Sequence, residues 1–380
     1  MTVKSVRARD LGISFKGITG NFNAITDVAG VKVGYSTIID GEGELIVGKG
    51  PVRTGVTAIL PRGQEGLLKN NACFAAWHSL NGNGEMTGTT WIEESGLLEG
   101  PVMITNTHSV GIVRDSVIKL YIKNNYNANK EFFWLLPVVA ETYDGMLNDI
   151  NGFHVKESNV YEAIDTAKSG IPEEGNVGGG TGMVCHEFKG GTGTSSRVVS
   201  VAGKRYTIGA LVQANYGRRQ DFTLNGIPAG HEYTDSLPEF RSVSTPSMKD
   251  GSIIVVLATD APLLPHQLKR LAKRIPIGIG RLGGFGSHTS GDIFLAFSTC
   301  GNIIIDEDDP QKETIRKVES LTNELINGLL MGTIEVTEEA ILNALVAAKT
   351  MEGINRNRVY SASHDTLMQI IQKYRSGVSL

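Results

Sequence analysis

The chain holds 380 residues, of which 41% are hydrophobic and 20% charged, so it has ample apolar material for a large core and is not a disordered protein. Its 36 basic and 40 acidic side chains give a formal net charge of -4, which argues against a nucleic-acid partner, and no apolar run reaches the ~20 residues that span a membrane. The 46 glycines exceed the usual share of about 7%, which predicts a site built from turns and close backbone contacts.

The cysteines and histidines give no sign of a metal or redox site. Cys73, Cys185 and Cys300 are far apart, so they fit neither a disulfide framework nor a CxxC metal motif, and we expect small buried thiols in a reducing compartment. The 8 histidines show no HExxH or similar ligand spacing. The N-terminus is basic but lacks the apolar core of a signal peptide, so we expect a cytoplasmic protein.

The first half of the chain predicts strands separated by glycine-rich turns. Alternation, β-branched residues and helical spacing predict, in chain order, a strand over 54–61, a strand over 100–107, a helix over 110–123, a buried apolar run over 132–142, a helix over 157–169 and a strand over 206–217. Two glycine clusters, GNVGGGTGM and KGGTGTSS, occupy 175–196.

Residues 218–250 differ from the rest of the chain. The segment is polar, contains three prolines and has neither helical nor strand periodicity. Irregular loops beyond ~12–15 residues are uncommon inside domains unless they are functional or are linkers. This one leads directly into Gly251-Ser252 and a strongly β-branched strand predicted over 251–263.

The remainder of the chain predicts mainly helices. We expect an amphipathic helix over 264–274, and a β-hairpin over 291–305 that turns at Cys300-Gly301-Asn302. Two closing helices are predicted over 310–329 and 337–349, and Thr337 is the expected N-cap of the second.

Three short motifs match known sites but lack their context. The GxGxxG run 278–283 follows a predicted helix, whereas a dinucleotide site needs a strand before it. In the near-P-loop 43–50, Gly50 replaces the Ser or Thr that binds Mg²⁺, so we interpret it as a hairpin turn. Ser109 resembles a hydrolase nucleophile, but the first glycine of that elbow is missing, which favours a polar turn that caps a helix.

Gly251-Ser252 is the strongest candidate for chemistry. A serine hydroxyl needs an adjacent base, and one solution is an N-terminal serine whose own α-amine, of pKa near 7.7–8.0, takes the proton. An internal serine gains that amine only if the bond before it is cut. An acyl shift from nitrogen to oxygen, followed by hydrolysis, would free the amine, and glycine at 251 allows the strained geometry this requires.

The whole chain resembles a known family of enzymes. DGSIIVVLATDAPL and RLGGFGSHTSGDIFLAFST look like the self-processing serine aminopeptidases called L-aminopeptidase D-Ala-esterase/amidase, a family that includes the β-peptidyl aminopeptidases. The resemblance continues, in order, through NGNGEMTG (81–88), TNTHSVG (105–111), LLPVVAETYDGMLNDINGFHV (135–155), GNVGGGTGM (175–183) and LVQANYG (211–217).

The resemblance implies a fold and a maturation step. The expected fold is α/β, a four-layer αββα sandwich shared with the ornithine acetyltransferases, formed by one catalytic domain over 1–380. Cleavage between Gly251 and Ser252 would give associated fragments 1–251 and 252–380. The resemblance also implies a homo-oligomer of processed protomers, with four as the expected number.

The resemblance assigns the catalytic residues one by one. Ser252 falls on the family nucleophile, and Ser290 and Asp292 fall on the serine and carboxylate that support it; alternate residues of a strand share a face, so both can reach one site. The β-peptidyl members carry Glu at this carboxylate, and Asp292 is one methylene shorter. Tyr143 and Asn215 fall on the phenol and amide that stabilise the oxyanion.

Two further residues are assigned to substrate binding. Glu141 and Trp134 match positions that line the pocket for the free amino group of the substrate, where a carboxylate beside an aromatic wall suits an ammonium. Without the resemblance, Glu141 would be interpreted as a solvated charge and Trp134 as part of the core. The implied reaction needs no cofactor, and its substrates are small peptides, amides or esters with a free amino group.

Two other functions are compatible with the resemblance. The ornithine acetyltransferases pass an acyl group to an amine through the same kind of intermediate, but their nucleophile is Thr, and Ser252 favours hydrolysis. A member that binds amines without processing itself is disfavoured, because every expected catalytic side chain is present.

Overall fold

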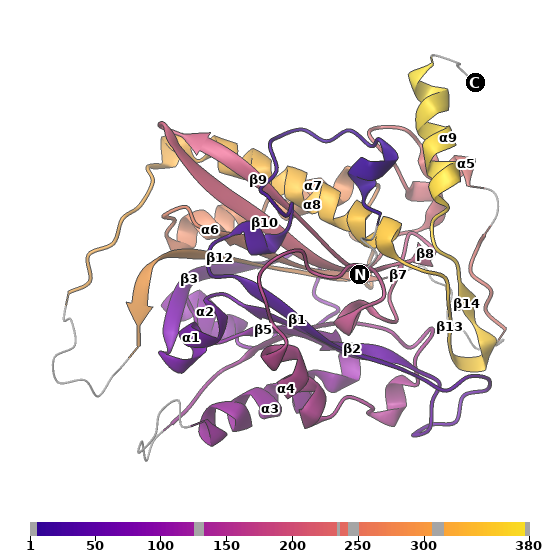
Figure 1. The fold of residues 1–380 in the computed structure, drawn as a ribbon, viewed down its shortest axis with the longest axis horizontal. Coiled ribbons are helices and arrows are strands. Elements are labelled where there is room, and N and C mark those ends of the chain that lie inside the picture. The colour runs from indigo at the N-terminus through magenta and orange to yellow at the C-terminus, as the bar shows by residue number, and fades with distance from the viewer. Residues whose placement is uncertain (1–5, 125–132, 234–235, 242–250, 306–314, 377–380) are drawn as a thin grey trace.

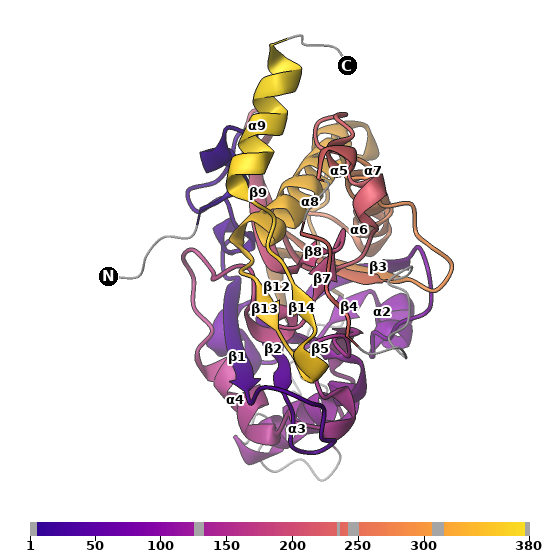
Figure 2. The ribbon, with the colours of Figure 1, turned by 90° about the vertical axis from the view of Figure 1, so that its right-hand side faces the viewer.

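Two β-sheets lie face to face at the centre of the molecule, in a computed structural model that describes residues 6–124, 133–233, 236–241, 251–305 and 315–376. The 4-stranded sheet has the order β1-β2-β5-β6, and the 6-stranded sheet has the order β4-β3-β12-β11-β10-β9. Helices cover the outer face of each sheet (Figures 1 and 2). The chain therefore forms the predicted four-layer αββα sandwich.

The elements are bounded as follows. The strands of the two sheets are β1 (Lys32–Asp40), β2 (Val52–Leu60), β3 (Asn71–Ser79), β4 (Leu97–Leu98), β5 (Val102–Asn106), β6 (Val138–Thr142), β9 (Gly191–Val201), β10 (Lys204–Asn215), β11 (Ser252–Thr259) and β12 (Gly291–Ile304). Two small hairpins are formed by β7 (Val184–Cys185) with β8 (Phe188–Lys189) and by β13 (Met351–Glu352) with β14 (Arg358–Val359). The helices are α1 (Gly63–Leu68), α2 (Thr89–Ser95), α3 (Val110–Lys123), α4 (Glu157–Asp165), α5 (Ala229–Glu232), α6 (Pro265–Ala272), α7 (Ile275–Gly280), α8 (Asn327–Ala347) and α9 (His364–Arg375).

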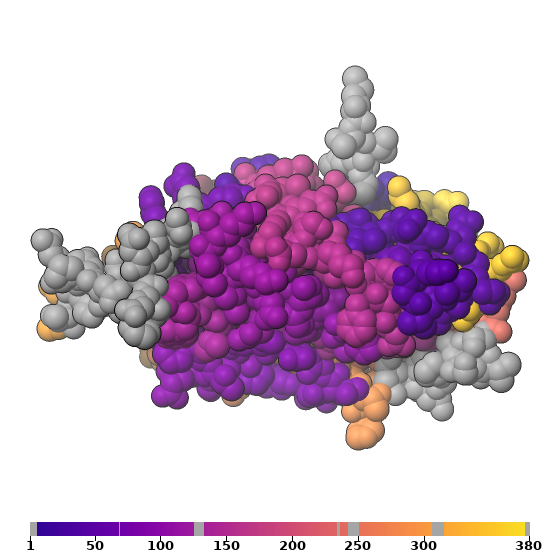
Figure 3. Space-filling view, turned by 90° about the horizontal axis from the view of Figure 1, so that it is seen from below, coloured from indigo at the N-terminus to yellow at the C-terminus, as the bar shows by residue number. Residues whose placement is uncertain are grey.

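Three apolar layers hold the sandwich together. Ile59 and Ile104 of one sheet pack against Ile254 and Leu295 of the other. A second core joins the 6-stranded sheet to α6, α7 and α8, and a third joins the 4-stranded sheet to α1, α3 and α4. The first half of the chain forms most of the face below the 4-stranded sheet (Figure 3). Strands β2 and β11 are buried along their whole length, and β11 accordingly has a nearly continuous apolar sequence.

Most predicted elements are confirmed. The predicted elements over 54–61, 100–107, 110–123, 157–169, 206–217, 251–263 and 264–274 correspond to β2, β5, α3, α4, β10, β11 and α6. The run 132–142 ends in β6. The described part of 218–250 holds only short helical turns and α5, and residues 242–250 lie outside the described residues.

The predicted hairpin at Cys300-Gly301-Asn302 is wrong. Residues 291–304 form the single strand β12, and both halves pair with β3: Ile293 lies opposite Ser79, and Ile304 lies opposite Asn71. The register shifts between Ser298 and Ile303, where Gly301 has φ +74°. Gly301 therefore belongs to a bulge that bends the strand rather than to a turn that reverses it.

The two predicted closing helices are also wrong. Residues 327–347 form one helix, α8, whereas the described part of 310–326 holds only a short 3-10 turn at Asn323–Leu325. Thr337 is not an N-cap but an interior residue whose hydroxyl donates to the Thr333 carbonyl oxygen at 2.8 Å. A Cβ on Gly332 would lie 3.1 Å from Ile208, so this glycine lets α8 pack closely on β10.

The two glycine motifs fall where their context predicted, and the expectation of buried thiols holds for two of the three cysteines. The segment 43–50 lies in the loop between β1 and β2, and the GxGxxG run begins inside α7. Cys73 and Cys185 are buried, whereas Cys300 is half-buried. Within the described ranges, no helix has the length and apolar character needed to cross a membrane.

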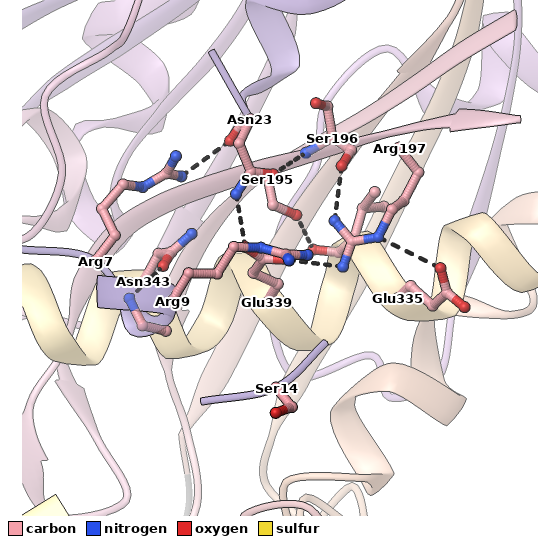
Figure 4. Close-up of polar contacts among 12 residues, drawn as sticks. Arg7, Arg9, Ser14, Asn23, Ser195, Ser196, Arg197, Glu335, Glu339 and Asn343 are labelled. Atoms are coloured by element: carbon pink, nitrogen blue, oxygen red, sulfur yellow. Dashed lines mark hydrogen bonds and ion pairs between the residues drawn. The ribbon is translucent and has the colours of Figure 1, made fainter. Parts of the chain in front are cut away.

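A buried ion-pair cluster ties the N-terminal segment to β9 and α8 (Figure 4). The Glu339 carboxylate accepts hydrogen bonds from Arg9 at 2.7 and 2.8 Å, from Arg197 at 2.6 Å and from Asn23 at 2.6 Å. Arg197 also pairs with Glu335 at 3.3 Å. Burial alone would raise the pKa of Glu339, but the two arginines and Asn23 outweigh it and lower that pKa.

Candidate active site

The central strands of the 6-stranded sheet bring the candidate residues together. Ser252 is the first residue of β11 and lies directly opposite Asn215, the last residue of β10. On its other side it lies opposite Gly291 of β12, between Ser290 and Asp292. Ser252, Asn215, Ser290 and Asp292 are all buried. The strand register therefore places four of the predicted catalytic residues at one end of three neighbouring strands.

Ser290 connects the candidate cleavage site to Asp292. The Ser290 hydroxyl contacts the Gly251 carbonyl oxygen in a short hydrogen bond and lies 2.7 Å from Asp292 Oδ1. Asn81 donates to the other Asp292 oxygen at 3.3 Å, and the Gly291 N–H donates to Ser252 Oγ at 3.1 Å. Although Asp292 is shorter than the Glu of the β-peptidyl members, it reaches Ser290 directly.

The Ser290 hydroxyl has one hydrogen, so it can donate to only one of its two neighbours, the Gly251 carbonyl oxygen or Asp292. An ionised Asp292 would accept that hydrogen and leave the Gly251 carbonyl without a donor. A protonated Asp292 can itself donate to Ser290, which then donates to Gly251. Burial raises the pKa of Asp292, although Ser290 and Asn81 oppose the shift, so the protonated form is more accessible here than at an exposed aspartate.

A cavity of about 570 Å³ opens beside these residues. Its lining includes both residues of the Gly251–Ser252 bond together with Tyr143, Asn215 and Glu141. One space is thus lined by the predicted nucleophile, the two predicted oxyanion donors and the predicted ammonium-binding carboxylate. It is large enough for a small ligand.

The two predicted oxyanion donors are held in different ways. Asn215 Oδ1 accepts the Val184 N–H at 2.8 Å, and its Nδ2 donates to the Tyr143 carbonyl oxygen at 3.0 Å, so the backbone at both ends fixes the amide orientation. The Tyr143 ring folds over Gly145, where a Cβ would overlap the phenol. Burial and the neighbouring Asp144 raise the pKa of Tyr143, which keeps the phenol protonated and able to donate.

Glu141 is buried at the end of β6 and points at the same cavity. It accepts the Glu85 N–H at 2.9 Å and the Thr107 hydroxyl at 2.5 Å. Burial raises the pKa of Glu141, although these two donors and the nearby His108 oppose the shift, and Glu141 forms no ion pair with a described residue. A buried carboxylate in a cavity and without a counter-ion suits a cationic ligand.

Trp134 lies apart from this group. It is 52% exposed and packs edge-on against Trp91, with the ring centroids 5.5 Å apart. It is not among the described residues that line the 570 Å³ cavity. Ser109 is buried in the turn before α3 and also lies outside that lining, and its side chain makes no capping hydrogen bond to the helix.

The structure adds residues that sequence reasoning did not single out. Asn81 donates a hydrogen bond to Asp292, and Thr107 donates one to Glu141. Both donors lie inside segments that carried the family resemblance. Asp144 is fully buried beside Tyr143, where it accepts from Asn106 at 2.9 Å and from Asn148 at 3.0 Å; burial raises its pKa to about 6. The described residues contain no group of three or more His, Cys, Asp or Glu that could hold a metal.

Comparison with known proteins agrees with this geometry. The sequence model of peptidase family S58 matches residues 23–359. The β-peptidyl aminopeptidase BapA of Sphingosinicella microcystinivorans is 52% identical, over 97% of this chain and 92% of that protein. The L-aminopeptidase D-Ala-esterase/amidase of Ochrobactrum anthropi, described as a variant of the Ntn hydrolase fold, superposes with a TM-score of 0.89 at 47% identity and covers 97% of this chain and 99% of its own. A Burkholderia sp. β-aminopeptidase superposes at 0.87 with 44% identity and the same coverage.

Proposed function

The chain belongs to peptidase family S58, and we propose that it cuts its own Gly251–Ser252 bond and then uses Ser252 to release N-terminal residues from small peptides, amides and esters. It is a self-processing serine aminopeptidase of the N-terminal-nucleophile class. The observation that carries the residue assignment is the Gly251 carbonyl, which accepts the Ser290 hydroxyl while Ser252 and Asn215 line the adjacent cavity.

Maturation begins with attack of Ser252 Oγ on the Gly251 carbonyl carbon. The Ser290 hydroxyl polarises that carbonyl and stabilises the oxygen as it gains charge. As the tetrahedral intermediate collapses, the proton lost by Oγ is transferred to the Ser252 nitrogen, the peptide C–N bond breaks, and the acyl group remains on Oγ while the nitrogen becomes an amine. Water then hydrolyses the ester, which releases the Gly251 carboxylate and frees the serine hydroxyl.

The mature site uses the new amine as its base. The Ser252 α-amine takes the hydroxyl proton as Oγ attacks the substrate carbonyl, and it passes the proton to the leaving amine. Tyr143 and Asn215 donate to the oxyanion, and Glu141 binds the substrate ammonium. Water hydrolyses the acyl-enzyme. Because two similar proteins are β-aminopeptidases, we include N-terminal β-amino acids among the substrates.

The assignment is tested by Ser252→Ala. The variant lacks the attacking oxygen, so the purified chain should keep its full-length mass and hydrolyse none of a panel of amino-acid p-nitroanilides. Ser109→Ala, at a buried serine outside the cavity, should process and hydrolyse like the wild type. A Ser252→Ala protein that gives two bands on a denaturing gel, or that keeps its activity, would refute Ser252 as the nucleophile.

We further propose that processed protomers assemble into a homo-oligomer, with four copies as the expected number. The half-exposed Trp134 and the neighbouring exposed Leu136 support this, because they offer an apolar surface for a second protomer to cover. A light-scattering mass equal to one protomer would overturn the assembly and leave the catalytic proposal intact.

A further inference from the structure

A fully buried lysine lies behind the active site. Lys189, at the end of β8, has no exposed surface, and its ammonium donates to the carbonyl oxygens of Met183 at 2.8 Å, Gly190 at 2.9 Å and Gly180 at 3.4 Å. In the described part of the chain, it forms no ion pair with a carboxylate. Burying a cation without a counter-ion is costly, and an apolar residue of similar length would avoid that cost.

One of these carbonyls belongs to the peptide group that holds Asn215. The Met183 C=O accepts from Lys189, and the N–H at the other end of the same peptide, on Val184, donates to Asn215 Oδ1 at 2.8 Å. Asn215 Nδ2 donates one of its two hydrogens to the Tyr143 carbonyl oxygen at 3.0 Å. Its second hydrogen is left for a ligand in the cavity that Asn215 lines.

We propose that Lys189 is a positioning residue of the reaction, which orients and polarises the Asn215 amide through the Met183–Val184 peptide. The Lys189 ammonium, which donates to the Met183 oxygen, draws electron density away from the Val184 N–H at the other end of the peptide. This N–H therefore becomes a stronger donor to Asn215. The Asn215 Nδ2–H is strengthened in turn, because hydrogen bonds in a chain polarise one another in a low dielectric. This inference rests on the proposed function, in which Asn215 stabilises the oxyanion.

The glycines around Lys189 make this chain of contacts possible. A Cβ on Gly190 would overlap the Ala214 carbonyl oxygen of β10, and a Cβ on Gly180 would overlap the Thr192 backbone nitrogen. The β7–β8 hairpin can therefore lie directly against the end of β10 that carries Asn215. Burial lowers the pKa of Lys189 to about 7, which is the expected result of placing an ammonium in this dry environment.

A second buried cation, which contacts the same hairpin from outside it, provides a matched control. Arg219 is 3% exposed and donates to the carbonyl oxygens of His186 at 3.1 Å and Glu187 at 2.8 Å, at the turn of the hairpin. Lys189 acts at the open end, where the peptide that holds Asn215 lies. Removing Arg219 loosens the hairpin but leaves the charged Lys189 side chain in contact with the Met183 carbonyl.

The test compares Lys189→Met with Arg219→Met in the processed enzyme, with amino-acid p-nitroanilides as substrates. Loss of a direct oxyanion donor costs about 10²–10³-fold in kcat. A residue that acts through that donor should cost less, about 5- to 50-fold in kcat, with KM unchanged within about twofold. Arg219→Met should lower the Tm but keep kcat within about twofold of the wild type.

A double variant separates this role from a general structural one. In an Asn215→Ala background, Lys189→Met should lower kcat by less than about twofold, because its route to the oxyanion is already gone. Lys189→Gln keeps a donor without the charge, so its kcat should lie between those of the wild type and Lys189→Met. If Lys189→Met does not fold, the Gln variant carries the test.

Three results would overturn the inference: wild-type kcat in Lys189→Met or Lys189→Gln, an equal kcat loss in Arg219→Met, or an undiminished loss in the Asn215→Ala background. A wild-type protein that neither processes nor hydrolyses amides would instead refute the proposed function.

Discussion

A methyl group on residue 251 would overlap the Asn215 carbonyl oxygen and lie 2.7 Å from the Tyr216 Cα. Glycine is therefore required at this position for contact with β10, and not only for backbone freedom. The same close approach holds the Gly251 carbonyl against Ser290.

Gly251→Ala should therefore slow self-cleavage. The added methyl group would push the carbonyl away from the Ser290 hydroxyl, and we expect processing to slow by at least about 10-fold, the effect of losing one charge-assisted donor. The cleaved fraction is measured on denaturing gels over time after purification. Gly280→Ala is the control, because a Cβ there meets nothing within 4 Å. Cleavage of Gly251→Ala at the wild-type rate would show that the contact with Ser290 does not limit processing.

A second prediction for a single side chain concerns Glu141. Glu141→Gln should lower kcat/KM for free-amine substrates by about 10- to 150-fold, the effect of losing a desolvated charge-assisted bond, and should do little to N-acetylated esters. Equal losses on both substrates would assign Glu141 a structural role.

The pH profile gives an independent check on Glu141. Only the ionised carboxylate attracts an ammonium, and burial raises the pKa of Glu141 above its ordinary value. The activity on free-amine substrates should therefore fall as pH drops through a value higher than that of an exposed glutamate, and this limb should be absent from the Glu141→Gln profile.

At the scale of elements, local pattern predicted the strands and helices that are either buried throughout or amphipathic with a clear period. The β-branched run of β11 and the helical spacing of α3 were sufficient. The strands β1 and β3 were not predicted, because their burial follows no clean alternation. The catalytic residues depended on family resemblance, since no local signal distinguishes Asn215 from a turn residue at the end of a strand.

The errors lie where tertiary contacts override local preference. A turn is predicted at Gly301, and Gly332 lies between the two helices predicted over 310–329 and 337–349. In the structure, the first bends β12 while the strand keeps its partner β3, and the second lies in contact distance of Ile208. A sequence cannot distinguish a glycine that breaks an element from one that allows a neighbour to approach, because the difference lies in the neighbour.

The contact between β9 and α8 gives a testable case of close approach. A Cβ on Gly193 would overlap the Ala340 carbonyl oxygen and lie 2.8 Å from the Ala344 Cβ, so Gly193→Ala should force α8 away and destabilise the fold by about 1–3 kcal/mol. Gly111→Ala is the control, because Gly111 is an exposed residue of α3 with open space around it. It should be neutral or slightly stabilising. Similar Tm values for both variants would contradict this account.

At the scale of the whole molecule, the cluster around Glu339 joins the two fragments expected from processing. Arg9, Arg197 and Asn23 belong to 1–251, whereas Glu339 belongs to 252–380. Glu339 and Arg197 are buried, and removal of the Glu339 charge takes the ion-pair partner from Arg9 and the shorter of two ion pairs from Arg197.

Glu339→Gln should destabilise the processed protein by about 3–5 kcal/mol, since it removes the carboxylate that pairs with Arg9 and leaves Arg197 with only the 3.3 Å contact to Glu335. Separation of the fragments by urea, followed by size exclusion, measures the loss. Glu93→Gln is the matched control, because Glu93 pairs with Lys269 across the same two fragments at 2.6 Å, but both side chains are largely solvated. It should cost less than about 1 kcal/mol. Equal midpoints for the two variants would contradict a role for the buried cluster.

The position of β11 and β12 also determines what survives a cycle of denaturation. Both strands lie in the middle of the 6-stranded sheet, with β10 on one side and β3 on the other, and the proposed cut falls at the first residue of β11. The uncut chain can find this arrangement by a unimolecular search, because one backbone connects all of the strands. After the cut, the same sheet can be rebuilt only by an encounter between two molecules, each of which exposes unpaired strand edges. After maturation, the intramolecular route by which the sheet was first assembled would therefore no longer exist. The lifetime of each active copy would end with its first unfolding.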